Sequence, residues 1–136
     1  MKKLFFLFSI FSSLNIFGQD INGVWADSSS SSFTNPTAVF AIKNDSVYMT
    51  HYVEFNGHPF VEYGIGTIKG NQLRYKVFVT VQIPDWTTTQ GEHVLTLSED
   101  GNTLRGYFKD NSGNSGPIVF KRKLPISKNS NGTKLD

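Results

Sequence analysis

Short runs rich in Val, Ile, Phe, Tyr and Thr alternate with turn sequences through most of this chain, and this alternation constrains the fold most strongly. The turn sequences include Asn44-Asp45, Asn56-Gly57 and Gly70-Asn71. Asn-Gly is a strong hairpin signal, because both residues tolerate a positive φ. No window of helical length has a 3.6-residue apolar period, so the pattern predicts an antiparallel meander. We expect eight strands, near residues 21–27, 37–43, 46–55, 58–69, 72–83, 92–98, 103–109 and 117–122.

The three two-residue turns predict which residues face each other across the hairpins. They place His51 opposite Glu62, Glu62 opposite Val79, and Ala38 opposite His51. In this register one sheet face is almost entirely apolar, whereas most of the charges fall on the other face. The residues predicted to face inward are otherwise Phe40, Ile42, Val47, Met49, Val53, Phe55, Phe60, Ile68, Leu73, Tyr75, Val77, Val81 and Ile83.

An apolar sheet face needs a cover, and no helix is predicted to supply one. The sheet should therefore close on itself as an eight-stranded antiparallel up-and-down barrel. A two-sheet β-sandwich is the alternative. Gly64, Gly66 and Gly106 fall on the predicted inner side, where a missing side chain permits a strand to bend.

The first 19 residues have the order of a secretory signal peptide, with Lys2 and Lys3 before a short apolar run. That run is shorter than the roughly 20 residues that span a bilayer. We expect a signal peptide at 1–19, a barrel domain at 20–124 and a disordered polar tail at 125–136. The protein should be secreted or periplasmic, from a bacterial host, without a membrane anchor.

Composition excludes several classes of function. The chain has no Cys, which rules out disulfides, a lipoprotein anchor and Cys-based metal sites. Without Lys2 and Lys3 the basic and acidic residues are equal in number, so no basic surface predicts a nucleic-acid partner. No nucleophile elbow or phosphate-binding loop is present, and we expect neither an enzyme nor a cofactor.

The segment Gly23-Val24-Trp25 lies on the first predicted strand, and Arg122 lies at the end of the last one. A Gly-x-Trp in this position of an eight-stranded meander resembles the calycins, the barrel group that contains the lipocalins and avidins. The resemblance implies that Trp25 closes the base of the barrel and that Arg122 packs over it. It also implies that ligands enter at the opposite end.

The long loops 27–36, 84–91 and 110–116 should form that opposite end, the mouth. We expect a pocket for a small apolar ligand inside the barrel. Its walls would be formed by Phe40, Met49, Phe60, Tyr75 and Val79, with Trp86 at the mouth.

His51 and Glu62 stand out because they are polar residues on the apolar face. They can be polar anchors for a ligand or a structural pair in which each satisfies the other. His58 and His93 also fall on the inner side, near the mouth. Imidazoles can bind zinc or copper, but the chain has no closely spaced pair of histidines, and we expect no metal.

The alternative function is a protein-interaction or inhibitor module. In that case the barrel would be filled by its own side chains, and loops 27–36 and 84–91 would make the contacts. A continuous cavity above roughly 300 Å³ would favour the carrier.

Overall fold

The computed structural model describes residues 20–124, and these form an all-β domain of eight antiparallel strands. The predicted signal peptide and tail lie outside the described residues. Several strands show the two-residue alternation of buried and exposed side chains typical of a half-buried sheet, as in residues 46–53. The strands are β1 (Gly23–Asp27), β2 (Phe33–Lys43), β3 (Ser46–Phe55), β4 (His58–Lys69), β5 (Gln72–Val79), β6 (Gln90–Leu97), β7 (Thr103–Asp110) and β8 (Ser115–Arg122).

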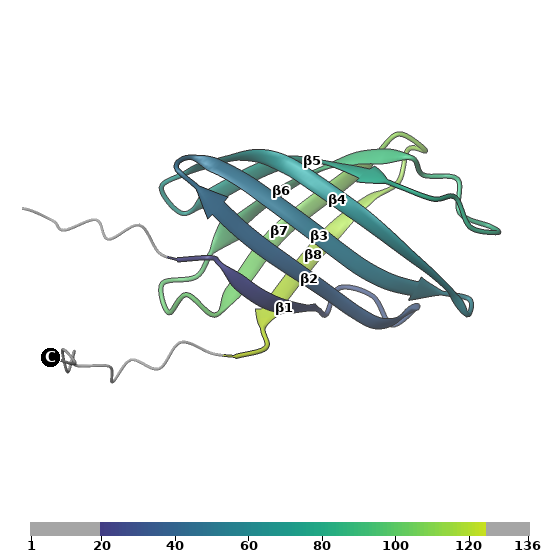
Figure 1. Cartoon of the computed structure of the whole chain (residues 1–136), viewed down its shortest axis with the longest axis horizontal. Coiled ribbons are helices and arrows are strands. Elements are labelled where there is room, and N and C mark those ends of the chain that lie inside the picture. Colours follow the sequence, from purple (N-terminus) through teal and green to yellow (C-terminus); the bar gives the residue numbers. More distant parts are fainter. Residues whose placement is uncertain (1–19, 125–136) are drawn as a thin grey trace, which may run out of the picture.

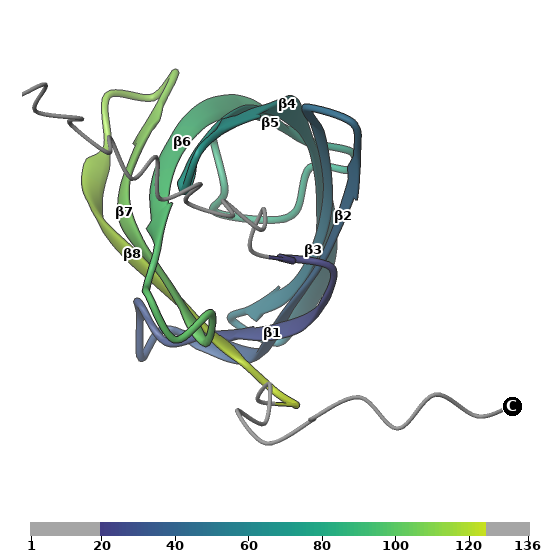
Figure 2. The same cartoon turned by 90° about the vertical axis from the view of Figure 1, so that its left-hand side faces the viewer.

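The strands follow one another around a closed barrel, seen from the side in Figure 1 and along its axis in Figure 2. Closure is made by β1 and β8, which pair antiparallel from Trp25 opposite Arg122 to Asp27 opposite Phe120. The barrel is therefore the correct prediction and the sandwich is not. Within residues 20–124 the structure contains no helix that is long and apolar enough to cross a membrane.

The predicted register is confirmed at all three tight turns. His51 faces Glu62, Glu62 faces Val79, and Ala38 faces His51. At the β3–β4 turn both Asn56 and Gly57 have positive φ, as the mirror-image hairpin turn requires. The turn chemistry thus determines which side chains of β2 to β5 enter the barrel.

Gly66 and Gly106 lie where neighbouring strands approach too closely for a side chain. A Cβ on Gly66 would stand 2.0 Å from the Arg74 carbonyl oxygen, and one on Gly106 would stand 1.8 Å from the Val94 carbonyl oxygen. Both positions permit the sharp curvature that closes a small barrel.

Side chains fill the half of the barrel nearest the tight β2–β3, β4–β5 and β6–β7 turns. Trp25 is fully buried there, and its indole N–H donates to the Ile21 carbonyl at 3.1 Å. Phe40 packs edge-on against Trp25, Tyr75 and Phe120. The Arg122 guanidinium lies over the Trp25 ring, as the calycin resemblance implies. The architecture is consistent with a calycin-like fold.

The structure differs from the sequence prediction mainly at strand ends. β2 begins at Phe33 because it continues through an irregularity between Thr34 and Thr37, where Asn35 has a positive φ. β5 ends at Val79, and the predicted inward position of Val81 is wrong: it is 65% exposed. Thr80 still donates its backbone N–H and its hydroxyl to the Val61 carbonyl on β4, and the chain bends at residues 80 and 81.

Candidate functional site

A cavity of about 310 Å³ occupies the half of the barrel beneath the long loops. All eight strands contribute to its walls, together with the loops after β1 and β5. Its lining is Asp27, Ser29, Ser30, Phe33, His51, Glu62, Val77, Val79, Trp86, Thr88, Gln90, Gly91, His93, Phe108, Lys109, Asp110, Pro117 and Ile118.

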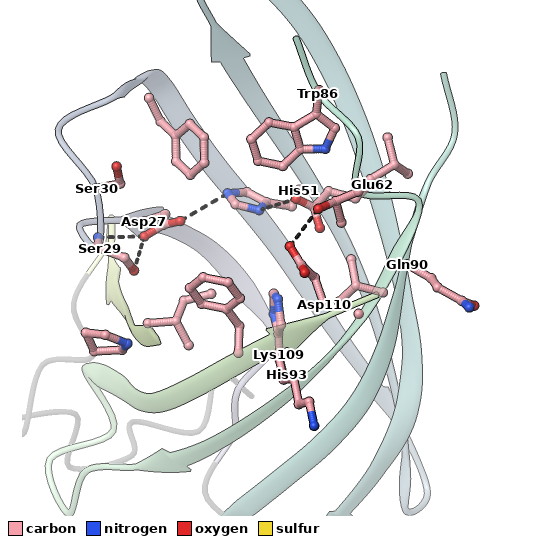
Figure 3. A pocket seen from close by; sticks show the side chains of 18 residues that line it. Asp27, Ser29, Ser30, His51, Glu62, Trp86, Gln90, His93, Lys109 and Asp110 are labelled. Carbon is pink, nitrogen blue, oxygen red and sulfur yellow. Dashed lines mark hydrogen bonds and ion pairs between the residues drawn. The ribbon is translucent and has the colours of Figure 1, made fainter. Parts of the chain in front are cut away.

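His51 lies between two carboxylates at the floor of this cavity (Figure 3). Its Nε2 is 3.6 Å from Asp27 Oδ2, and its Nδ1 is 3.6 Å from Glu62 Oε1. The His51 side chain is only 2% exposed, and neither ring nitrogen has a hydrogen-bond partner. Its ring packs edge-on against Phe120, a fully buried residue of the core. His51 thus presents unsatisfied polar atoms at the boundary between core and cavity.

The loop after β1 holds Asp27 in place. Asp27 Oδ1 accepts hydrogen bonds from the backbone N–H of Ser29 at 2.7 Å and from the Ser29 hydroxyl at 2.5 Å. The Ser29 hydroxyl in turn accepts from the Val119 N–H on β8. One carboxylate oxygen of Asp27 is therefore used to fix the loop, which leaves Oδ2 directed at His51 (Figure 3).

His93 lies on β6, in another wall of the cavity, and is held in place by Tyr75 in the core. Its Nδ1 is 3.0 Å from the Tyr75 hydroxyl, and the two rings pack edge-on. Burial lowers the pKa of His93 to about 4, against the opposing influence of Glu62 and Asp27. Burial raises the pKa of Tyr75 well above its ordinary value, and the charges of Glu62 and Asp27 act in the same direction. Both groups are consequently neutral near pH 7.

An aromatic cluster borders the cavity at the mouth. Trp86, on the β5–β6 loop, contacts Phe33, Phe55 and Phe60, with ring centroids 5.9, 5.2 and 5.0 Å away. Its indole N–H is buried and has no hydrogen-bond partner. The Trp86 ring lies across the cavity from His93 and above His51 (Figure 3).

Asp110 ties the β5–β6 loop to the β7–β8 turn. Its carboxylate accepts from the Thr88 hydroxyl at 2.6 Å, from the Ser112 N–H at 2.9 Å, and from both the N–H and the amide of Asn114. Burial by itself would raise the pKa of Asp110, but these hydrogen bonds outweigh it and hold the pKa below its ordinary value. Both carboxylate oxygens of Asp110 therefore accept hydrogen bonds from the loops, and few acceptor positions are left for a ligand.

The structure brings together five of the residues predicted to bind a ligand. These are His51, Glu62, Val79, Trp86 and His93. Two aromatic residues lie one step behind the lining: Tyr75 supports His93, and Phe60 supports Trp86.

Three other predicted residues lie away from the cavity lining. Phe40 and Met49 belong to the filled half of the barrel, which the sequence analysis had assigned to the pocket. His58 is exposed, because it starts β4 directly after the β3–β4 turn, opposite Phe55 and beyond Phe60. Gly23 begins β1 with a φ of 137°, and a Cβ there would stand 3.0 Å from an Arg122 guanidinium nitrogen.

The sequence analysis missed Asp27 and Phe108 as cavity residues. Asp27 follows Trp25 by two positions on β1, so the strand alternation that turns Trp25 inward also turns Asp27 inward. Phe108 pairs with Gly116 on β8 and with His93 on β6. The alternation was a sufficient signal for both, had it been followed to the strand ends.

The arrangement offers hydrogen bonding and charge to a ligand. No group of three or more His, Asp or Glu residues within 20–124 is arranged to hold a metal ion. Comparison with protein-family models gives no match to this chain, and comparison with curated proteins gives none either.

Proposed function

We propose that this protein is a calycin-like carrier that binds one small, largely apolar molecule inside its barrel. The observation that carries the proposal is the cavity of about 310 Å³ with the buried, unpartnered ring nitrogens of His51 at its floor. Ligand pockets of about 300–1,000 Å³ are typically apolar with a few convergent polar groups. The proposal includes export, which is supported by Lys2, Lys3 and the apolar run that follows them.

Unsatisfied polar atoms at a buried site are the second support. Leaving a buried donor or acceptor without a partner costs about 1–3 kcal/mol. A ligand that supplies a hydrogen bond to His51 recovers that cost, whereas an apolar filler does not. This favours the interpretation of His51 and Glu62 as ligand anchors over that of a self-satisfied structural pair.

The cavity also bears on the alternative function. An interaction module that works through its loops needs no interior space, and the cavity supports a carrier instead.

Native mass spectrometry of the purified protein, followed by titration with the neutral fluorophore N-phenyl-1-naphthylamine, tests the proposal. We expect a co-purified small molecule or saturable fluorophore binding at one site. Val79→Trp should abolish binding, because Val79 lines the cavity. Val81→Trp is the matched control, since Val81 is 65% exposed and outside the lining, and it should bind normally. Equal binding by both variants would contradict an internal site.

A further inference from the structure

The charged groups that face the cavity are predominantly acidic. Asp27 and Glu62 flank a single imidazole, His51, so even a fully protonated ring can balance only one of the two carboxylates. They lie on β1 and β4, which reach the cavity from two sides. Uncompensated negative charge in a buried site attracts a cation and repels an anion.

The chain supplies little positive charge of its own here. Lys109 is the only Lys or Arg among the described residues of the lining, and it is an exposed residue whose ammonium group points away from the acidic cluster (Figure 3). Arg74 lies on the outer face of the barrel, where it pairs with Glu92 at 2.8 Å. His93 is neutral near pH 7 because burial lowers its pKa to about 4.

The walls around the acidic cluster suit an organic cation. Trp86 and Phe108 both line the cavity, and Phe108 packs edge-on against His93. Aromatic faces attract ammonium groups and pack well against the apolar part of such a ligand. Ammonium has only donors, and it can bind carboxylate oxygens and an unprotonated imidazole nitrogen together.

We propose that the ligand is a small organic amine, bound as its cation, with the ammonium group at Asp27, His51 and Glu62 and the apolar part against Trp86 and Phe108. This inference rests on the proposed carrier function and specifies its ligand class. Two observations support it independently: the excess of carboxylates over cations, and the pair of His51 ring nitrogens without hydrogen-bond partners inside the cavity.

Three matched compounds test the charge preference on the unmodified protein. These are 2-phenylethylamine, the neutral 2-phenylethanol and the anionic 3-phenylpropionate, titrated by isothermal calorimetry at pH 7. We expect the amine to bind at least about tenfold more tightly than the alcohol, and the acid to bind most weakly. An alcohol that binds as tightly as the amine, or an acid that binds best, would overturn the inference.

A variant pair locates the preference within the cavity. Glu62→Gln should remove the preference for amine over alcohol and leave alcohol binding nearly unchanged. Glu92→Gln is the control, because Glu92 pairs with Arg74 on the outer face, and it should behave as the unmodified protein does. If Glu62→Gln keeps the full preference, the assigned carboxylate is wrong.

The failure of this inference is distinguishable from failure of the carrier function. If N-phenyl-1-naphthylamine binds but the amine is not preferred, the ligand class is wrong and the carrier stands. If neither the fluorophore nor any of the three compounds binds, the internal site itself is wrong.

Discussion

The guanidinium carbon of Arg122 lies 4.3 Å from the centroid of the Trp25 ring. The two residues face each other across the β1–β8 seam that closes the barrel. Arg122 also donates to the carbonyls of Gly101, Asn22 and Asp20, at 3.1, 2.8 and 2.6 Å. One side chain thus joins the first strand, the last strand, the β6–β7 turn and the segment before β1.

Arg122→Ala should therefore destabilise the barrel by roughly 2–4 kcal/mol, because it removes a cation–π contact and leaves three carbonyl oxygens without their donor. Urea unfolding followed by tryptophan fluorescence measures the loss. Arg105→Ala is the control, since Arg105 is exposed on β7, and it should change stability by less than about 0.5 kcal/mol. Equal effects of the two substitutions would contradict the role of Arg122.

Gly66→Ala should destabilise the protein by about 3 kcal/mol or more, because its methyl group would overlap the backbone of β5. The new Cβ would stand 2.0 Å from the Arg74 carbonyl oxygen and 2.4 Å from Tyr75 Cα. Thermal unfolding by circular dichroism measures the effect. Thr67→Ala, at the exposed neighbouring position, should have a small effect, and a stable Gly66→Ala would show that β4 and β5 can separate locally.

The sequence predicted the barrel because local turn chemistry and strand alternation agree with each other. Asn56-Gly57 alone places His51 opposite Glu62, and the structure confirms the pair. Alternation describes only which face a side chain occupies, however. It does not reveal how far along the barrel the interior is filled, which is why Phe40 and Met49 were assigned to a pocket that begins above them.

Strand ends were the second source of error, because they depend on contacts that are distant in sequence. Val81 continues the alternation of β5, yet the strand ends at Val79 and the chain bends at Thr80 and Val81. Alternation along β1 turns Asp27 inward, but the orientation of its carboxylate depends on the β1–β2 loop, which is bonded to the distant strand β8. The candidate site was therefore found through the His51–Glu62 pair, with its third polar member missing.

The neutral state of His93 predicts an acid-dependent loss of stability. Its pKa is about 4 in the folded protein against an ordinary value of 6.5, so the unfolded chain takes up the proton more readily. The stabilisation is complete above pH 6.5 and is lost as the pH falls toward 4, by about 3 kcal/mol in total.

His93→Gln separates this effect from other titrations, because glutamine can still bond to the Tyr75 hydroxyl but does not titrate. Glu62, Asp27 and His51 also act on His93 and remain in both proteins. The unfolding free energies of the two proteins, measured in urea from pH 7 to pH 4, should therefore converge or cross as the pH falls. Parallel curves would show that His93 titrates normally in the folded state.

Asp110→Ala should loosen the mouth while the barrel stays folded. The substitution removes the acceptor for Thr88, Ser112 and Asn114, so the β5–β6 loop that carries Trp86 loses its attachment to the β7–β8 turn. We expect amide hydrogen exchange at residues 86–90 and 111–114 to accelerate, with a global loss of about 1–3 kcal/mol. Asp110→Asn is the control that keeps one acceptor oxygen, and it should show a smaller effect at the same amides. Acceleration spread evenly over all eight strands would instead mean that Asp110 supports the whole barrel.

If the loop gates the cavity, N-phenyl-1-naphthylamine should leave Asp110→Ala faster than it leaves the unmodified protein, which stopped-flow displacement measures directly.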